Sequence, residues 1–151
     1  MTDKVRDYKI LLSAIYNVLT ILTHKAMTIS NDTIDQIRKR GGILSEEVTQ
    51  FAIYCYEGGV ISKTKAEMAF QINSLITEEK NTSAWSNLFV KIISDYLLQD
   101  LSSPGEVDCS ECNWLLREIQ NHQAPNSNQK KLVRYLKIHT TPFPVELEAL
   151  L

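Results

Sequence analysis

One stretch of this chain, residues 100–119 (DLSSPGEVDCSECNWLLREI), combines turn chemistry, charge and apolar spacing in the pattern of a loop that leads into a helix. Its proline–glycine pair favours a turn, and Val107 follows as an apolar anchor. Asp108 and Glu111 have the spacing of a capping box, in which each side chain accepts a hydrogen bond from a backbone N–H group left unpaired at a helix start. The stretch therefore predicts a tight loop and a helix whose N-cap is Asp108.

A weaker copy of this pattern lies 46 residues upstream, in residues 54–73 (YCYEGGVISKTKAEMAFQIN). When the glycines are aligned, the equivalent pairs are Gly59 and Gly105, Ile61 and Val107, Ser62 and Asp108, and Met68 and Trp114. Two apolar helices joined by a short loop cannot bury their own faces, so we expect the two units to pack together. Trp114 is predicted to be a core residue of the second unit.

Helical periodicity also runs through the rest of the chain, and no alternating strand pattern of useful length is present. Further helices are expected over residues 2–26, from Ser30 or Asn31 to Arg40, from Ser45 to the glycines at 58–59, over 63–79, around 85–97, after Asn126 or Ser127, and after Pro144. We predict an all-α, single-domain bundle of about seven helices built around two EF-hand-like helix-loop-helix units. Its parts are N-terminal helices in 1–44, the paired core in 45–121 and C-terminal helices in 122–151.

The first predicted helix has an unusually wide apolar stripe. Apolar residues spaced three and four apart line one side of it: Val5, Tyr8, Leu12, Ile15, Leu19 and Leu22. Leu11, Val18 and Ile21 widen that side. Such a helix is buried on more than one side, either at the centre of the bundle or against a second chain in a homodimer.

Charge gives little support to a nucleic-acid-binding function. The chain has 16 Lys and Arg against 18 Asp and Glu, a net charge of −2, which is unlike a dedicated nucleic-acid surface. The basic triplet at residues 38–40 fits the cationic last turn of a helix. Residues 41–125 carry five basic and twelve acidic side chains, so the acidity lies on the two loop units. This negative charge would favour binding of a cation or a basic partner, although acidic residues also gather at helix starts.

Cysteine usage and hydropathy indicate a cytoplasmic protein. Three cysteines, Cys55, Cys109 and Cys112, are too few for a disulfide framework, which favours a reducing compartment. The longest apolar run, residues 10–22, contains polar residues and is shorter than the roughly 20 residues needed to cross a bilayer. We therefore expect no membrane span and no signal peptide.

The second loop matches a calcium-binding EF-hand loop in part. A twelve-position EF-hand loop takes oxygen ligands at positions one, three, five, seven, nine and twelve, with glycine at six. Counted from Asp100, the candidate metal ligands are Asp100, Ser102, Glu106, Asp108 and Glu111, and Gly105 occupies position six. Pro104 at position five supplies no side-chain ligand, so we expect a structural turn, with a weakly bound divalent cation as the alternative.

No catalytic residue can be nominated from the sequence. Cys109 and Cys112 form a CxxC pair, the spacing of zinc and redox sites, but no second CxxC and no βαβ pattern accompany it. Cys112 is instead expected to lie partly buried beside Trp114. No serine or cysteine on a strained turn with a histidine partner is evident, so a non-enzymatic protein without a cofactor is predicted.

Three segments resemble a group of small uncharacterised bacterial proteins and, more loosely, TerB-like tellurite-resistance domains. They are GGVISKTKAEMAF, WSNLFVKIISDYLL and PGEVDCSECNWLL, within about residues 45–140. The resemblance implies an all-α bundle in which glycine-acidic loops begin helices, and an association with metal-stress responses and protein complexes. The first loop departs from that pattern, because Lys65 stands where an acidic residue is expected.

The leading functional prediction is a non-catalytic helical module that binds another protein, in a stress-response or defence setting. It follows from the wide apolar first helix and the absence of a catalytic set. One alternative is an immunity or antitoxin protein that blocks a toxin. The other is a divalent-metal binder that uses the loop at residues 100–111.

Overall fold

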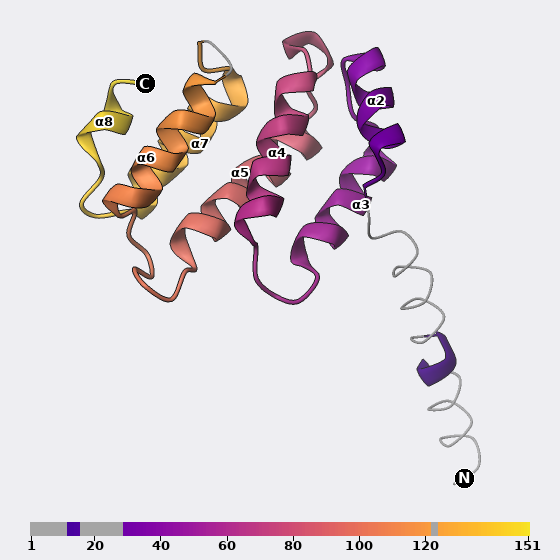
Figure 1. Cartoon of the computed structure of the whole chain (residues 1–151), viewed down its shortest axis with the longest axis horizontal. Coiled ribbons are helices and arrows are strands. Elements are labelled where there is room, and N and C mark those ends of the chain that lie inside the picture. The colour runs from indigo at the N-terminus through magenta and orange to yellow at the C-terminus, as the bar shows by residue number, and fades with distance from the viewer. Residues whose placement is uncertain (1–11, 16–28, 122–123) are drawn as a thin grey trace, which may run out of the picture.

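The computed structural model describes residues 12–15, 29–121 and 124–151. Within these ranges the chain is all-α, without a strand (Figure 1). Residues 12–15 are helical, and the later helices are α2 (Asn31–Arg40), α3 (Ser45–Tyr56), α4 (Lys63–Leu75), the 3-10 helix η1 (Glu78–Lys80), α5 (Ser83–Leu98), α6 (Cys109–Gln120), α7 (Ser127–His139) and α8 (Val145–Glu148). The prediction of an all-α helical domain is confirmed.

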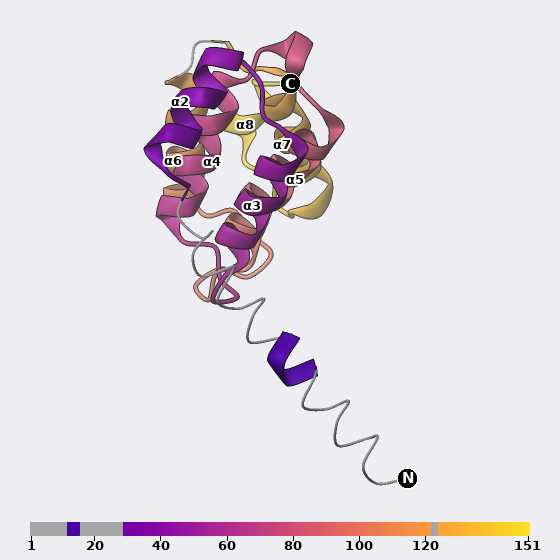
Figure 2. The same ribbon diagram turned by 90° about the vertical axis from the view of Figure 1, so that its right-hand side faces the viewer.

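Helix α5 lies at the centre of the bundle. It packs against α7, α4 and α3, while α2 packs on α4 and α8 packs on α6. Figure 1 shows α3, α4 and α5 side by side, with α6 and α8 at the side away from α2 and α3, and Figure 2 views the bundle from the side of α2 and α3. One hydrophobic core joins all these helices, and its largest fully buried side chains include Trp85, Phe51, Phe70, Phe89 and Leu97. No helix of the described ranges is long and apolar enough to cross a membrane.

Most predicted helix starts are confirmed by their caps. Ser30 caps α2, Thr82 caps α5 and Asn126 caps α7, each through a side chain that accepts a backbone N–H. The expected helix over 63–79 is wrong at its end, because α4 stops at Leu75 and the chain becomes extended. The Thr77 N–H then donates to the Gly41 carbonyl at 2.9 Å, which ties this turn to the end of α2.

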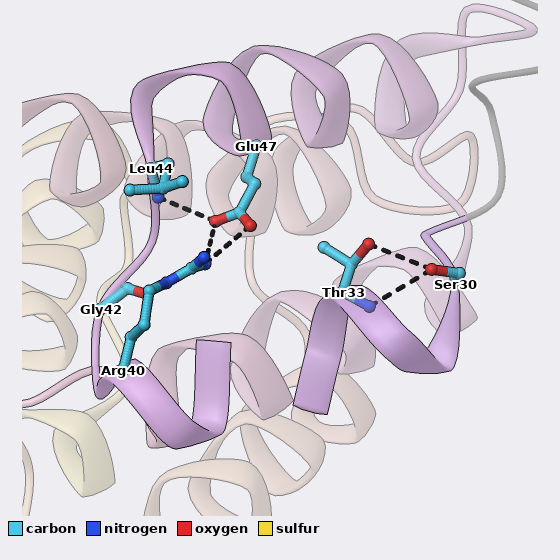
Figure 3. Close-up of polar contacts among 6 residues, drawn as sticks. All are labelled: Ser30, Thr33, Arg40, Gly42, Leu44 and Glu47. Carbon is cyan, nitrogen blue, oxygen red and sulfur yellow. Dashed lines mark hydrogen bonds and ion pairs between the residues drawn. The ribbon is translucent and has the colours of Figure 1, made fainter. Parts of the chain in front are cut away.

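An ion pair closes the corner between α2 and α3 (Figure 3). Arg40 donates to both carboxylate oxygens of Glu47 at 2.6 and 2.5 Å, and Glu47 also accepts the Leu44 N–H at 2.8 Å. Gly41, with φ of +66°, ends α2 in the left-handed conformation that glycine adopts without strain. The basic triplet therefore belongs to a helix end, as predicted, and Arg40 has a structural partner.

A buried cluster of polar side chains links α4, α5 and α7. The Asn73 Oδ1 accepts hydrogen bonds from the Trp85 Nε1 at 3.2 Å and from the Asn128 Nδ2 at 2.8 Å. Asn128 also exchanges two hydrogen bonds with Asn81, at 2.8 and 3.1 Å. Asn73 and Asn128 are almost completely buried, so these hydrogen bonds replace most of those lost with water, and only the Asn73 Nδ2 of this cluster is buried without a partner among the described residues.

The predicted helix over residues 2–26 falls mostly outside the described residues. Its described part, residues 12–15, is helical and exposed. In both views this turn lies apart from α2 to α8 (Figures 1 and 2). The described part of the chain therefore does not cover Leu12 or Ile15.

Trp114 is a core residue, as predicted from the sequence. Its ring meets Phe70 of α4 edge-on at 5.7 Å between centroids, and Tyr96 of α5 at 4.9 Å. We expect Trp114→Ala to lower the free energy of unfolding by about 3 to 5 kcal/mol, because it removes these contacts and leaves a cavity. Urea denaturation measures this loss.

The matched control is Leu101→Ala, since Leu101 is a large apolar residue that is fully exposed. Its effect should stay within about 0.5 kcal/mol. A loss below about 1 kcal/mol in Trp114→Ala would contradict the assignment of this ring to the core.

Candidate functional site

The two predicted loops lie at the same end of the bundle (Figure 1). Residues 57–62 connect α3 to α4 and residues 99–108 connect α5 to α6, and we call these two segments together the loop end. The two loops share one local conformation, because Gly59 and Gly105 have φ values of +78° and +79°. Ile61 and Val107 are both buried, so the predicted equivalence of these positions is confirmed.

The second loop is held by hydrogen bonds from its own residues. The Gly105 N–H donates to the Leu98 carbonyl at 2.8 Å, which closes the turn at the end of α5. Asp100 accepts from the Ser103 N–H at 3.0 Å and from the Ser102 hydroxyl. These hydrogen bonds stabilise the charged form of Asp100 and lower the pKa of its carboxyl.

The capping box at the start of α6 is confirmed. The Glu111 N–H donates to the Asp108 Oδ1 at 2.8 Å, and the Asp108 N–H donates to the Glu111 Oε2 at 2.9 Å. Both carboxylates therefore satisfy backbone donors that the helix itself leaves unpaired. This is the structural use of Asp108 and Glu111 that the sequence predicted.

The loop brings three of the candidate metal ligands near one another. Burial raises the pKa of Glu111, the hydrogen bond from the Asp108 N–H opposes this rise, and the nearby charges of Asp100 and Asp108 add to it. Ser102 and Glu106 are exposed. Among the described residues, however, no group of three or more His, Cys, Asp or Glu side chains is arranged to hold a metal ion.

The first loop uses a cation of its own in the equivalent place. Lys65 aligns with Glu111, and its Nζ donates to the carbonyls of Cys55 at 3.0 Å and Glu57 at 2.9 Å. The ammonium group thus binds the carbonyls at the C-terminal end of α3, where the helix dipole favours positive charge. The departure of this loop from the acidic pattern therefore has a structural role.

Tyr56 and Asp95 were not singled out by the sequence, yet they join α3 to α5 beside the loop end. The Tyr56 hydroxyl donates to the Asp95 Oδ2 at 2.6 Å, and Lys91 donates to the same oxygen at 2.9 Å. Burial raises the pKa of Tyr56 well above its ordinary value, and the hydrogen bond to Asp95 adds to that rise. The two residues are 39 positions apart, so no local pattern marks the pair.

A small cavity of about 190 Å³ lies between the two loops. Its lining includes Val60 from the first loop and Tyr96 and Asp100 from the second unit. Val60 and Leu101 expose large apolar side chains at the loop end. Exposed apolar side chains beside a small cavity are typical of a surface that contacts another molecule.

The CxxC pair lies at the start of α6. Cys109 is exposed and Cys112 is buried, and both are free thiols. Cys112 shares the hydrophobic core with Trp114, in line with its expected burial beside this ring.

No protein-family model matches this chain, and no curated protein or solved structure shows significant similarity to it. The resemblance to TerB-like domains therefore stays a prediction.

We predict that calcium leaves the stability of the protein unchanged. The carboxylates of Asp108 and Glu111 already accept backbone hydrogen bonds, and Asp100 accepts from two serines. A bound ion at 100 times its Kd would add about 2.7 kcal/mol, which is several degrees in melting temperature. Thermal melts with and without millimolar calcium test this, with magnesium as the control ion. A rise of several degrees that is lost in Glu111→Gln would establish a calcium site.

A second prediction concerns the pH dependence that Glu111 confers. Its pKa is raised in the folded protein, so folding disfavours the charged form, and this penalty is present at neutral pH. As the pH falls through the raised pKa, protonation removes the penalty. Glu111→Gln keeps an oxygen for the Asp108 N–H but cannot titrate. At pH 7 the variant should therefore be at least as stable as the wild type, and its advantage should disappear towards pH 4.

Urea denaturation between pH 4 and pH 8 measures the two stabilities. Glu106→Gln is the matched control, since Glu106 is an exposed glutamate of the same loop. A Glu111→Gln variant that is clearly less stable than the wild type at pH 7 would show that the negative charge of Glu111 stabilises the loop.

Proposed function

We propose that this chain is a non-catalytic helical module that acts by binding another protein chain, with two EF-hand-like units as its scaffold. The observation that carries the proposal is the exposure of Leu12 and Ile15. They lie one helical turn apart, and their side chains are 51% and 46% exposed. Residues 12–15 are exposed throughout, so this turn has no covering helix among the described residues.

The sequence around this turn continues the same apolar stripe. Val5, Tyr8, Leu12, Ile15, Leu19 and Leu22 alternate steps of three and four residues. That alternation is the seam of a coiled coil, in which each apolar side chain enters a hole on a facing helix. A stripe that is left exposed in water is energetically unfavourable, so a partner helix that covers it stabilises the complex.

The partner that best fits this stripe is a second copy of the same chain. A two-fold dimer needs one surface that is complementary to itself, and a heptad seam meets this requirement. The charged residues beside the start of the stripe are of both signs, namely Asp3, Lys4, Arg6, Asp7 and Lys9. The toxin-blocking and metal-binding alternatives rest on no comparable feature of the described residues.

We expect the purified protein to be a dimer, and the double variant Leu12→Glu and Ile15→Glu to be a monomer. Two buried carboxylates at the seam would cost far more than the apolar contacts contribute. Sedimentation equilibrium at about 10 to 100 µM gives the mass, a range that detects a micromolar Kd. Ser13→Glu is the control, because Ser13 lies on the same turn outside the stripe. A monomeric wild type would reject the homodimer and leave a different protein as the partner to seek.

A further inference from the structure

The two cysteines of α6 lie on its first turn and face the same side. Cys109 is the first residue of the helix and is exposed, whereas Cys112 has only 5% of its surface exposed. Residues three apart in a helix are neighbours on one face. Helix geometry places their Cα atoms about 5 Å apart, within the range that a disulfide spans.

Both cysteines line a cavity of about 290 Å³ between the start of α6 and the chain that leads into α8. Val107, Pro142 and Phe143 give this cavity apolar walls. Its volume lies near the lower limit of small-ligand sites, about 300 Å³. The cavity is therefore about as large as the smallest ligand sites, and both thiols lie on its lining.

The burial of Cys112 beside this cavity also indicates a reactive site. The Cys112 residue is more than nine-tenths buried, lines the cavity and carries a free thiol. Cys109 lies on the solvent side of the same cavity. The pair thus combines an accessible thiol with a shielded one, the arrangement of a dithiol that closes after the first thiol reacts.

We propose that Cys109 and Cys112 form a dithiol–disulfide couple that reacts with low-molecular-weight disulfides. In the first step the Cys109 thiolate attacks one sulfur of the small disulfide, which forms a mixed disulfide and releases one small thiol. In the second step the Cys112 thiolate attacks the Cys109 sulfur and releases the other small thiol. The chain loses two protons and two electrons, and the small disulfide gains them as two thiols.

The order of the two steps follows from the different surroundings of the two thiols. Burial raises the pKa of Cys112, and the charges of Glu146 and Cys109 add to the rise. Because Cys112 is also shielded from solvent, its thiolate reaches only a sulfur that is already held beside it, such as the Cys109 sulfur of the mixed disulfide. Burial raises the pKa of Cys55 to about 12, and this thiol is fully enclosed. Cys55 serves as the internal control that does not react.

The test treats the full chain, under native conditions, with glutathione disulfide. Intact mass and peptide mapping identify the product, and circular dichroism confirms that each variant is folded. The wild type should lose two hydrogen atoms and show one bond, between Cys109 and Cys112. Cys112→Ala should stop at a mixed disulfide on Cys109, and Cys109→Ser, a substitution of an exposed residue, should not react.

Three results would overturn the proposal. The first is a wild type that does not react, and the second is a wild type that keeps a mixed disulfide at Cys109 without closing. The third is a disulfide that includes Cys55 or joins two chains. Because the wild-type result decides the matter alone, the test stands even if Cys112→Ala fails to fold.

Discussion

The buried amide cluster of Asn73, Asn81 and Asn128, together with the Trp85 indole, fixes how α4, α5 and α7 pack. Apolar contacts are non-directional and tolerate a helix that slides by a turn, but a buried hydrogen bond does not. If α7 shifted, Asn128 would lose its partners on both sides, and each unpaired buried group would cost about 1 to 3 kcal/mol. The central helix α5 meets α7 and α4 at this cluster, so the rest of the core is arranged around it.

The two loops of the loop end turn in a similar way, but side chains of opposite charge satisfy their backbone groups. Both loops reverse the chain through a glycine of positive φ and bury one apolar residue before the next helix. In the second loop the carboxylates of Asp108 and Glu111 satisfy backbone donors at a helix start. In the first loop the Lys65 ammonium satisfies backbone acceptors at a helix end. Only the first loop therefore has a cation of its own, the Lys65 ammonium, at the position where an EF-hand loop has a carboxylate that binds its metal ion.

The two proposals place activity at different parts of the molecule. The exposed turn at residues 12–15 is proposed to bind a second chain. The thiol pair is proposed to react with small disulfides beside one cavity. The chain that lines this cavity leads to α8, where Leu147 is fully buried. Because α8 packs on α6, the thiol pair lies where the C-terminal segment meets the bundle.

Local rules in the sequence were sufficient for most helix starts of the described residues and for the turns of the two loops. Capping boxes, glycines of positive φ and apolar spacing act over three or four residues, so they can be read directly, and Asp108, Gly105 and Trp114 lie where they were predicted. The helix predicted over 63–79 is longer than α4, which ends at Leu75. The Thr77 N–H donates instead to the carbonyl of Gly41, a residue that is distant in the sequence, so local spacing does not reveal this end.

The amide cluster, the Tyr56–Asp95 hydrogen bond and the cavity beside Cys109 were decided only by the tertiary structure. Each brings together residues that are far apart in the chain, and no short spacing marks such pairs. The sequence by itself determined an all-α chain with two similar loops, because helix formation and capping depend on near neighbours. Which buried polar groups meet, and which thiol is shielded, depends on how the helices pack.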